Sequence, residues 1–410
     1  MTSAVLSHTL DNGLTLVAEP IDSLESAAFS FLLPSGCCYD PKERSGLAGL
    51  TCEMSLRGAG SRDSRKFIED LEALGVEKGE SVTDAHASYR GATLAKSLLP
   101  ALELYADLIL RPKFPADQLE PARQVALQEL RAIEDEPSQR VMLELRRRQY
   151  PFPFGRSSHG EQAAVETISL DEIRRFHETF YQPTGAILGV AGRFEWEILK
   201  SQVGKLFANW KPKAAPQQKM EHRAEPVAHV PHESHQTQIG IAFDSVPYRD
   251  PDYFQAWGAV GVLSGGSSSR LFTEVREKRG LCYSVYASQH SLRDRGSVLC
   301  YAGTSAERAQ ETLDVTLGEL QRIAAGIEAT ELQRLKARIK SALIMQQESS
   351  SSRSSSIAHD HYHLGRVRSL DEVSAIIDQL SCDSINAYLV KNPPRDFRVV
   401  TLGPAELKVG

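Results

Sequence analysis

Residues 269–286 read Ser-Arg-Leu-Phe-Thr-Glu-Val-Arg-Glu-Lys-Arg-Gly-Leu-Cys-Tyr-Ser-Val-Tyr, and they decide the fold class because a helix pattern meets a strand pattern within them. Leu271, Phe272 and Val275 recur at helical spacing, with charged residues opposite. Gly280 stands where the end of a helix favours a left-handed residue. From residue 282 onward the side chains alternate as in a strand. The stretch predicts an amphipathic helix that turns at Gly280 into a strand, preceded by a flexible loop at residues 263–269.

This stretch resembles the second-half signature of the zinc-dependent processing peptidases, the family of pitrilysin, insulin-degrading enzyme and mitochondrial processing peptidase. The family carries an Arg and a Tyr at this junction, here Arg276 and Tyr283. The resemblance implies that they hold substrate and steady the oxyanion at a zinc site built by the other half of the molecule or by a partner chain. A guanidinium and a phenol O–H are donors suited to developing negative charge. The bare pair also fits a surface Arg and an ordinary strand Tyr, but the surrounding run favours the family role.

Residues 45–58, Ser-Gly-Leu-Ala-Gly-Leu-Thr-Cys-Glu-Met-Ser-Leu-Arg-Gly, resemble the metal-binding helix of the same family. The family pattern is Gly-Leu-Ala-His-x-x-Glu-His-Met, an inverted zinc motif whose two His bind zinc and whose Glu is the general base. Matched by position, Gly49 stands for the first His, Cys52 for the Glu and Glu53 for the second His. Gly49 offers no ligand atom, and Cys52 is a poor replacement for a carboxylate base. The resemblance therefore implies a degenerate metal helix.

The family's remaining zinc ligand, a Glu further along the chain, falls on Glu129, while an accompanying family acid falls on Ala122. Glu53 and Glu129 could form a two-carboxylate site, which would suit Mg or Ca better than Zn. The alternative is a helix that binds no metal and packs Leu47, Leu50 and Met54 as core.

The family's first half also has an edge strand written Asn-Ala-x-Thr, whose backbone pairs with the substrate. The matching run here is Gly79-Glu-Ser-Val-Thr83, which lacks the Asn. Backbone pairing does not need that side chain, so its loss is weaker evidence for lost function than the missing zinc ligands.

Composition bounds the remaining classes. A chain of 410 residues with 41% hydrophobic and 24% charged residues is typical of a globular protein with two or more domains. The net charge of −6 argues against nucleic acid as a partner. No apolar run approaches the ~20 residues of a membrane span, and the N-terminus lacks the pattern of a signal peptide. We therefore expect a cytoplasmic protein with neither membrane nor nucleic acid as a partner, and its six scattered cysteines should be reduced, mostly buried thiols.

The patterns repeat in outline after a polar, Pro-rich stretch at residues 211–226, which predicts a linker between an N-terminal domain at 1–210 and a C-terminal domain at 227–410. Ser169-Leu-Asp-Glu172 and Ser369-Leu-Asp-Glu372 occupy similar places in the two halves, and together with the order of elements they favour a duplication. Helices are predicted at 46–56, 64–74, 98–110, 115–133, 253–263, 306–325 and 330–345, and strands at 27–33, 185–192, 236–243, 283–288 and 297–302. Mixed strands and long helices predict an α+β fold in each half.

Other polar tracts are interpreted as structural. On a helix only His359 and His363 of His359-Asp-His-Tyr-His363 share a face, and His229, His232 and His235 would be split by strand alternation. Both groups are expected to be solvated rather than metal-binding. The run at 349–356, serine except for Arg353, is expected to be a helix start or a junction rather than a site.

The family resemblance spans nearly the whole chain and implies two related α+β domains, each a mostly antiparallel sheet backed by helices, in a clamshell around a chamber. In two-chain members one subunit carries zinc, and the other carries the Arg/Tyr pair and a Gly-rich loop. This chain resembles the second kind. We therefore expect the non-catalytic subunit of a heterodimeric zinc metallopeptidase that degrades or processes peptides. It would be inactive alone and bind no cofactor, and would supply Arg276, Tyr283 and the Gly265-Gly266 loop to a zinc-bearing partner.

Two other readings remain. The fold could serve as a structural or peptide-binding scaffold, although a scaffold has no stated need for Arg276 together with Tyr283. An active metallopeptidase with unusual ligands would have to explain Gly49.

Overall fold

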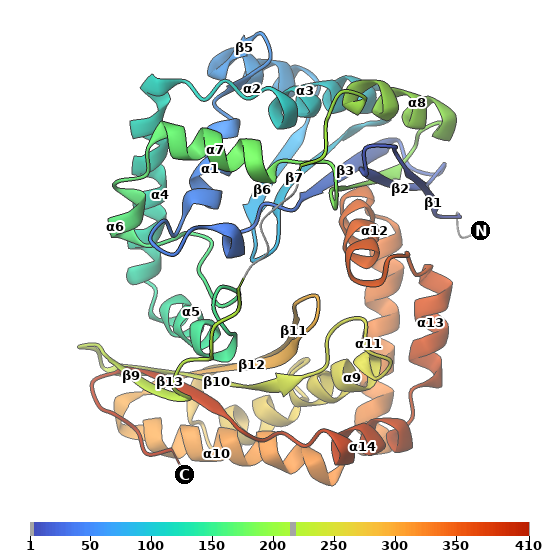
Figure 1. Ribbon diagram of the computed structural model, residues 1–410. Helices are drawn as coiled ribbons and strands as arrows, with labels where there is room; N and C mark the ends of the chain where they lie inside the picture. The colour runs from blue at the N-terminus through green and yellow to red at the C-terminus, as the bar shows by residue number, and fades with distance from the viewer. Residues whose placement is uncertain (1–3, 214–218, 410) are drawn as a thin grey trace. The chain divides into compact units, whose positions relative to one another are not determined.

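The computed structural model describes residues 4–213 and 219–409, which form two compact units, each with one main β-sheet and its own hydrophobic core (Figure 1). Neither unit is a continuous stretch of chain. Unit 1 comprises Met1–Ala132, Arg156–Met220 and Ile344–Ser369, and unit 2 comprises Ile133–Gly155, Glu221–Leu343 and Leu370–Gly410.

Unit 1 is built on a six-stranded sheet in the order β1-β2-β8-β3-β7-β6. Its strands are β1 (Leu6–Thr9), β2 (Thr15–Pro20), β3 (Ser26–Leu33), β6 (Glu77–Val82), β7 (Ala87–Leu94) and β8 (Ile187–Gly192), and a separate small ladder joins β4 (Gly58–Ala59) to β5 (Arg62–Asp63). Its helices are α1 (Leu47–Ser55), α2 (Ser64–Ala73), α3 (Leu98–Leu110), α4 (Leu119–Glu134, reaching into unit 2), α6 (Gln162–Val165), α7 (Leu170–Phe180), α8 (Trp196–Phe207) and α12 (Ser350–Leu364).

Unit 2 is built on a five-stranded sheet in the order β11-β12-β10-β13-β9. Its strands are β9 (Val227–Pro231), β10 (Gln236–Ser245), β11 (Cys282–Ser291), β12 (Gly296–Ser305) and β13 (Arg398–Gly403). Its helices are α5 (Pro137–Gln149), α9 (Tyr253–Leu263), α10 (Ala309–Arg322), α11 (Ala329–Gln347, whose end lies in unit 1), α13 (Leu370–Gln379) and α14 (Cys382–Lys391).

The two main sheets share one connectivity. In unit 1 the order β2-β8-β3-β7-β6 has a single parallel pair, β2 with β8. In unit 2 the order β9-β13-β10-β12-β11 likewise has a single parallel pair, β9 with β13. Each strand of unit 2 thus has a counterpart in unit 1, and β6 corresponds to β11 as the edge strand. The predicted α+β class is confirmed. The two main sheets also have the same topology, as expected of a duplication.

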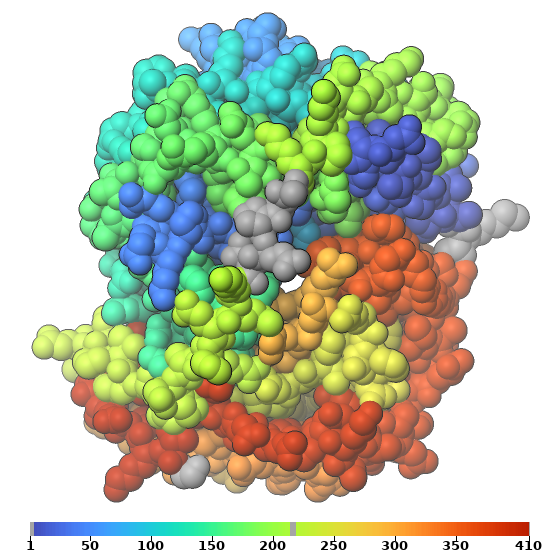
Figure 2. Space-filling view, in the orientation of Figure 1, coloured from blue at the N-terminus to red at the C-terminus, as the bar shows by residue number. Residues whose placement is uncertain are grey.

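One face of each main sheet is covered by a helix that comes from the other half of the sequence. Helix α12 packs on β8, β3 and β2 of unit 1, where Val17, Ile187, Ile357 and Ala358 form one buried cluster. Helix α5 packs on β10 and β13 of unit 2 through Val141 and Leu145. The dark blue surface of β1 and β2 accordingly borders the orange-red surface of the α12 region in the space-filling view, although the two are far apart in sequence (Figure 2).

The chain passes from unit 1 to unit 2 at residues 220–221, inside the predicted linker 211–226, of which residues 214–218 lie outside the described part. The predicted domains 1–210 and 227–410 did not include the exchange of residues 133–155 and 344–369 between the units. The spacing of apolar residues predicts that a segment is helical, but it does not predict which sheet that helix covers. No helix within the described residues is both long enough and apolar enough to cross a membrane. All six cysteines are free, and five are buried, as predicted.

Candidate functional site

The predicted helix-to-strand junction lies in unit 2 and contains an irregular turn. Residues Phe272–Glu277 are π-helical, and the Lys278 N–H donates to the Thr273 carbonyl at 2.9 Å. Gly280 then adopts a φ of +56°, the left-handed conformation predicted for it. Its N–H donates to the Arg276 carbonyl at 2.9 Å and ends the helix. A π-helical turn inserts one residue into a helix and is frequent at functional sites.

The structure brings Arg276 and Tyr283 together. The Arg276 guanidinium lies over the ring of Phe272, 4.9 Å from its centroid, and over the ring of Tyr283, 5.6 Å from its centroid. These are cation–π distances, so both rings orient the guanidinium. Within the described residues no carboxylate pairs with Arg276, and Tyr283 is 86% exposed. Both polar groups therefore remain available to a ligand.

A β-bulge explains why a large aromatic residue points outward here. Cys282 pairs with Thr304 and Ser284 with Gly303, so Tyr283 between them has no partner on β12. A bulge leaves its extra residue unpaired and re-aims the side chain. Because β11 is also an edge strand, no further strand of the sheet lies on the open side of Tyr283.

Arg308 stabilises the junction by hydrogen bonds to its backbone, a role that no sequence motif indicated. Its guanidinium donates to the Gly280 carbonyl at 2.8 Å and to the Arg279 carbonyl at 2.9 Å. It also lines a cavity of about 370 Å³ next to Tyr283, together with Gln238 and Tyr301. Carbonyls at the end of a helix have no partner within the helix, and Arg308 satisfies two of them.

The Gly265-Gly266 loop, predicted as a substrate contact, lies in the same unit. A Cβ atom on Gly265 would come within 1.7 Å of Nη1 of Arg338 on α11. The missing side chain of Gly265 thus leaves room for the Arg338 guanidinium to lie against the backbone of the loop. Within the described part of the chain no acidic side chain pairs with Arg338, so an unpaired guanidinium lies against this loop.

The degenerate metal helix is α1 of unit 1, and the place of its first ligand is closed. A Cβ atom on Gly49 would lie 2.8 Å from the Ser158 carbonyl oxygen, closer than real Cβ contacts come. The loop that carries Ser158 is itself held tightly, since Gly46 and Gly160 pack backbone to backbone: a Cβ on Gly160 would lie 2.4 Å from the Gly46 Cα. A histidine side chain could not occupy position 49 without moving this loop.

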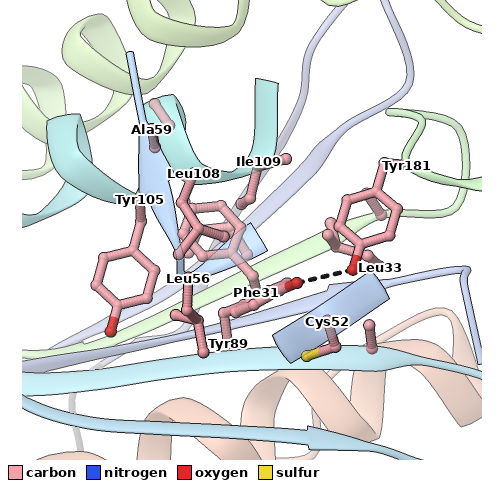
Figure 3. Close-up of a cluster of buried hydrophobic side chains, with 14 of the residues drawn as sticks. Phe31, Leu33, Cys52, Leu56, Ala59, Tyr89, Tyr105, Leu108, Ile109 and Tyr181 are labelled. Carbon is pink, nitrogen blue, oxygen red and sulfur yellow. Dashed lines mark hydrogen bonds between the residues drawn. The ribbon is translucent and has the colours of Figure 1, made fainter. Parts of the chain in front are cut away.

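Cys52 points into the core of unit 1 rather than acting as a base. It is 3% exposed and belongs to the cluster that contains Tyr89 and Tyr181, whose hydroxyl groups are 2.7 Å apart (Figure 3). Burial raises the pKa of the Cys52 thiol to about 12. The thiol therefore stays protonated at neutral pH and cannot replace the carboxylate base.

Glu53 and Glu129 both line a cavity of about 300 Å³ beside α1, but each has its own side-chain partner. Glu53 accepts a hydrogen bond from Arg57 Nε at 2.9 Å, one turn along the helix, and Glu129 Oε2 lies 3.5 Å from His159 Nδ1. Across residues 4–213 and 219–409, no group of three or more His, Cys, Asp or Glu side chains is placed to hold a metal ion. The residues present do not fit zinc, and the separate partners argue against a shared two-carboxylate site.

Comparisons with known proteins identify the family to which this chain belongs. Residues 17–157 match the family model described as Insulinase (Peptidase family M16), and residues 167–339 match the model described as Peptidase M16 inactive domain. The chain belongs to peptidase family M16. It is 26% identical over 404 residues to an uncharacterized zinc protease of Bacillus subtilis, covering 97% of this chain and 98% of that protein. It is also 26% identical over 405 residues to an uncharacterized zinc protease of Mycobacterium bovis, covering 97% and 92%.

Solved structures show the same M16 fold. The crystal structure of a peptidase M16 inactive domain from Pseudomonas fluorescens superposes with a TM-score of 0.90 at 23% identity, covering 99% of this chain and all of that one. A protease from Helicobacter pylori superposes with a TM-score of 0.90 at 21% identity, covering 98% of this chain and all of that one.

The M16 edge strand predicted at residues 79–83 is β6, which occupies one end of the sheet of unit 1. The absent Asn has not removed the strand. The prediction that the histidine tracts are solvated was only partly right, because His359 is exposed but His363 is buried, with 6% of its surface exposed. His359 and His363 stack on α12 with ring centroids 4.2 Å apart, and His229 Nδ1 lies 2.9 Å from Thr401 Oγ1 across two strands.

Sequence reasoning missed Phe272, Arg308 and His159 as parts of these sites. The spacing of Phe272 one turn before Arg276 was a usable signal, because such residues share a helix face. Arg308 and His159 reach their sites from distant parts of the chain and had no local signal.

Proposed function

We propose that this M16 chain is the non-catalytic subunit of a two-chain zinc peptidase, and that it supplies Arg276 and Tyr283 in trans to a partner's zinc site. One observation carries the proposal: the two donors are held together, face solvent and have no carboxylate partner among the described residues. The chain's own motif helix supports it, because Gly49 lacks a ligand atom and lies against Ser158.

The chain's own contribution to catalysis would be electrostatic. When water adds to a peptide carbonyl, negative charge develops on its oxygen, and preorganised donors lower the barrier most when they need not reorganise. The stacking of Arg276 between Phe272 and Tyr283 fixes the guanidinium before substrate arrives. The phenol O–H of Tyr283 would be the second donor. The partner would supply the zinc and the general base.

The Gly265-Gly266 loop would contact substrate backbone. Glycine allows close approach of another chain, and Arg338 behind Gly265 would attract a carboxylate or a carbonyl. This role is secondary in the proposal, since it positions substrate and does not touch the reacting bond.

The test is reconstitution with a homologous chain that carries an intact His-x-x-Glu-His motif. Cleavage of a quenched fluorogenic peptide should require both chains. Arg276→Ala and Tyr283→Phe should each lower kcat about 10²- to 10³-fold, the usual effect of removing an oxyanion donor. Light scattering after gel filtration should show an unchanged complex. Lys278→Gln and Tyr286→Phe are matched controls on the same turn and strand and should leave the rate unchanged.

Two outcomes would contradict the proposal. Unchanged kcat in both Arg276→Ala and Tyr283→Phe would remove their catalytic role and leave a peptide-binding scaffold as the better description. Close to one equivalent of tightly held zinc in the purified chain alone would mean that this chain builds a metal site of its own, and Glu53, Cys52 and Glu129 would then be the first residues to mutate.

A further inference from the structure

The edge strand β6 separates two cavities of unit 1. Glu80 and Val82 line the cavity beside α1, whereas Glu77, Lys78 and Gly79 line a second cavity of about 770 Å³, and Ser81 lines both. Successive side chains of a strand point to opposite faces, so one edge strand can contribute to both cavities. The register with β7 agrees, because Gly79 pairs with Arg90 and Arg90 lines the second cavity as well.

The far wall of the second cavity is the serine-rich start of α12. Ser354 packs its carbonyl against the sheet, where a Cβ on Gly189 would lie 2.3 Å away. With that face fixed on β8, Ser351, Ser352 and Ser355 line the cavity. The run that looked like low complexity in the sequence is thus a wall of short hydrogen-bonding side chains.

Arg90 is the distinctive group of this cavity. It is exposed, and its guanidinium extends across Gly79, where a Cβ would lie 3.7 Å from Nη2. No carboxylate of the described residues pairs with it; Glu77 lines the cavity without forming an ion pair, and Lys78 is paired to Glu80 at 3.3 Å. A free guanidinium surrounded by hydroxyl groups is a site for a carboxylate, which it can bind through two parallel hydrogen bonds.

Backbone pairing of a peptide with β6 is what the M16 resemblance implies; we propose that such a peptide directs alternate side chains into this serine-lined cavity, and that Arg90 there binds an acidic side chain of the peptide. The inference rests on the proposed function in that it takes a peptide as the ligand. It adds a preference for Glu or Asp at the one peptide position that faces Arg90. The open edge of β6 supplies the backbone pairing, and Arg90 supplies the selection.

The experiment uses the full chain without a partner, so its outcome does not depend on cleavage by a two-chain complex. The probes are a fluorescein-labelled peptide of alternating Thr and Glu and the same peptide with Gln for Glu, measured by fluorescence anisotropy. The wild-type chain should bind the Glu peptide about tenfold more tightly than the Gln peptide, the factor expected of one charge-assisted contact. Arg90→Gln should remove this preference while leaving the affinity for the Gln peptide unchanged. N-methylation of alternate backbone amides should abolish binding of both peptides, because it removes donors to β6.

Matched variants make the result specific. Arg65→Gln, an exposed Arg on α2, should leave the tenfold ratio intact, and Arg90→Glu should invert the preference in favour of a Thr-Lys peptide. Equal binding of the Glu and Gln peptides by the wild-type chain, a preference that survives Arg90→Gln, or no binding of either peptide would each overturn the inference. None of these results would bear on cleavage by the two-chain complex, which the variants of Arg276 and Tyr283 test.

Discussion

The two helix-to-strand junctions occupy equivalent places in the two units, yet they expose different groups. In unit 1, α2 ends before Gly75, whose φ is +64°, and the chain enters β6; in unit 2 the helix ends before Gly280, whose φ is +56°, and the chain enters β11. The closing hydrogen bond spans residues 71 to 76 in unit 1 and residues 275 to 281 in unit 2. The π-helical turn of unit 2 accounts for the longer span.

One inserted residue changes what the junction presents. An extra residue rotates the following side chains by about 100° around a helix axis. In unit 1 the last turn buries Leu71 in the core. In unit 2 Val275 fills the core and the next side chain, Arg276, faces outward against Tyr283. The same topology therefore yields a plain structural junction in one unit and a pair of exposed donors in the other.

The helices that cover the two sheets differ as well. Helix α12 is anchored to β2 by a buried ion pair, in which Arg353 Nε donates to Glu19 at 2.8 Å and Nη2 lies 2.6 Å from the same carboxylate oxygen. Helix α5 is anchored by the neutral amide of Gln149, which donates to Asp244 at 2.7 Å and to Ser297 at 2.8 Å. Loss of one partner should therefore cost much more in unit 1.

The largest expected effect tests this asymmetry of anchors. Arg353→Met should lower the free energy of unfolding by about 3–5 kcal/mol, because it leaves the Glu19 carboxylate buried without a partner. Gln149→Leu should cost only about 1–2 kcal/mol. Urea unfolding measures both. Arg353→Met combined with Glu19→Gln should recover most of the loss, and no recovery would show that the ion pair is not the source of the cost.

Each unit also contains a half-buried histidine with a strongly lowered pKa, and these two predict the pH dependence. Burial lowers the pKa of His177 in unit 1 and that of His290 in unit 2 to about 4. Between pH 4 and the ordinary His pKa of about 6.5 the unfolded chain binds more protons, so stability should fall as the pH falls through this window. His177→Gln and His290→Asn should each flatten the curve by about 2 kcal/mol.

Denaturation at pH 7 and pH 4.5 measures this difference. The buried carboxyl of Asp40, whose pKa burial raises to about 7, contributes the opposite slope, since its folded form binds the extra proton in the same window. Asp40→Asn is therefore the informative control and should steepen the loss of stability on acidification. A histidine variant with an unchanged slope would contradict the assignment of that histidine.

A third comparison concerns the closed metal position. Gly49→Ala should destabilise the chain by about 1–3 kcal/mol, because the new methyl group meets the Ser158 backbone. Gly204→Ala, in α8 with open space around it, should instead stabilise by about 0.5–1 kcal/mol.

The triple variant Gly49→His, Cys52→Glu, Glu53→His should fail to bind one equivalent of zinc by elemental analysis. Stoichiometric zinc would show that the loop at Ser158 yields readily.

The smallest effect compares the two junctions directly. Gly75→Ala and Gly280→Ala should each cost about 1–2 kcal/mol, because alanine is strained in the left-handed conformation that both glycines adopt. Thermal unfolding should therefore place the two variants together. Only Gly280→Ala should also reduce peptidase activity of the two-chain complex, since it displaces Tyr283. Equal activity of the two variants would remove the link between the π-helical junction and function.

Local signals were enough to predict many elements. Helix α3 runs from Leu98 to Leu110 and α9 from Tyr253 to Leu263, as the apolar spacing indicated. The capping box at Ser169 is present, with Glu172 N–H donating to Ser169 and the Glu172 carboxylate accepting in return. Helix α11 runs from Ala329 to Gln347 where a helix was predicted at 330–345, and the Glu331 carboxylate accepts from the backbone N–H of Glu328 at its start.

By itself the sequence determined which side chains exist and which local conformations they favour. It lacks zinc ligands at Gly49 and Cys52, it carries Arg276 and Tyr283 at a helix-to-strand junction, and it places glycine where φ must be positive. Only the tertiary structure decided that Tyr283 is the unpaired residue of a bulge, that Ser158 closes the metal position and that the serine run faces Arg90 across a cavity. The reason is the separation in sequence. Residue spacing and conformational propensity act between residues that are close in sequence, whereas these contacts join distant segments that meet only when a sheet is assembled.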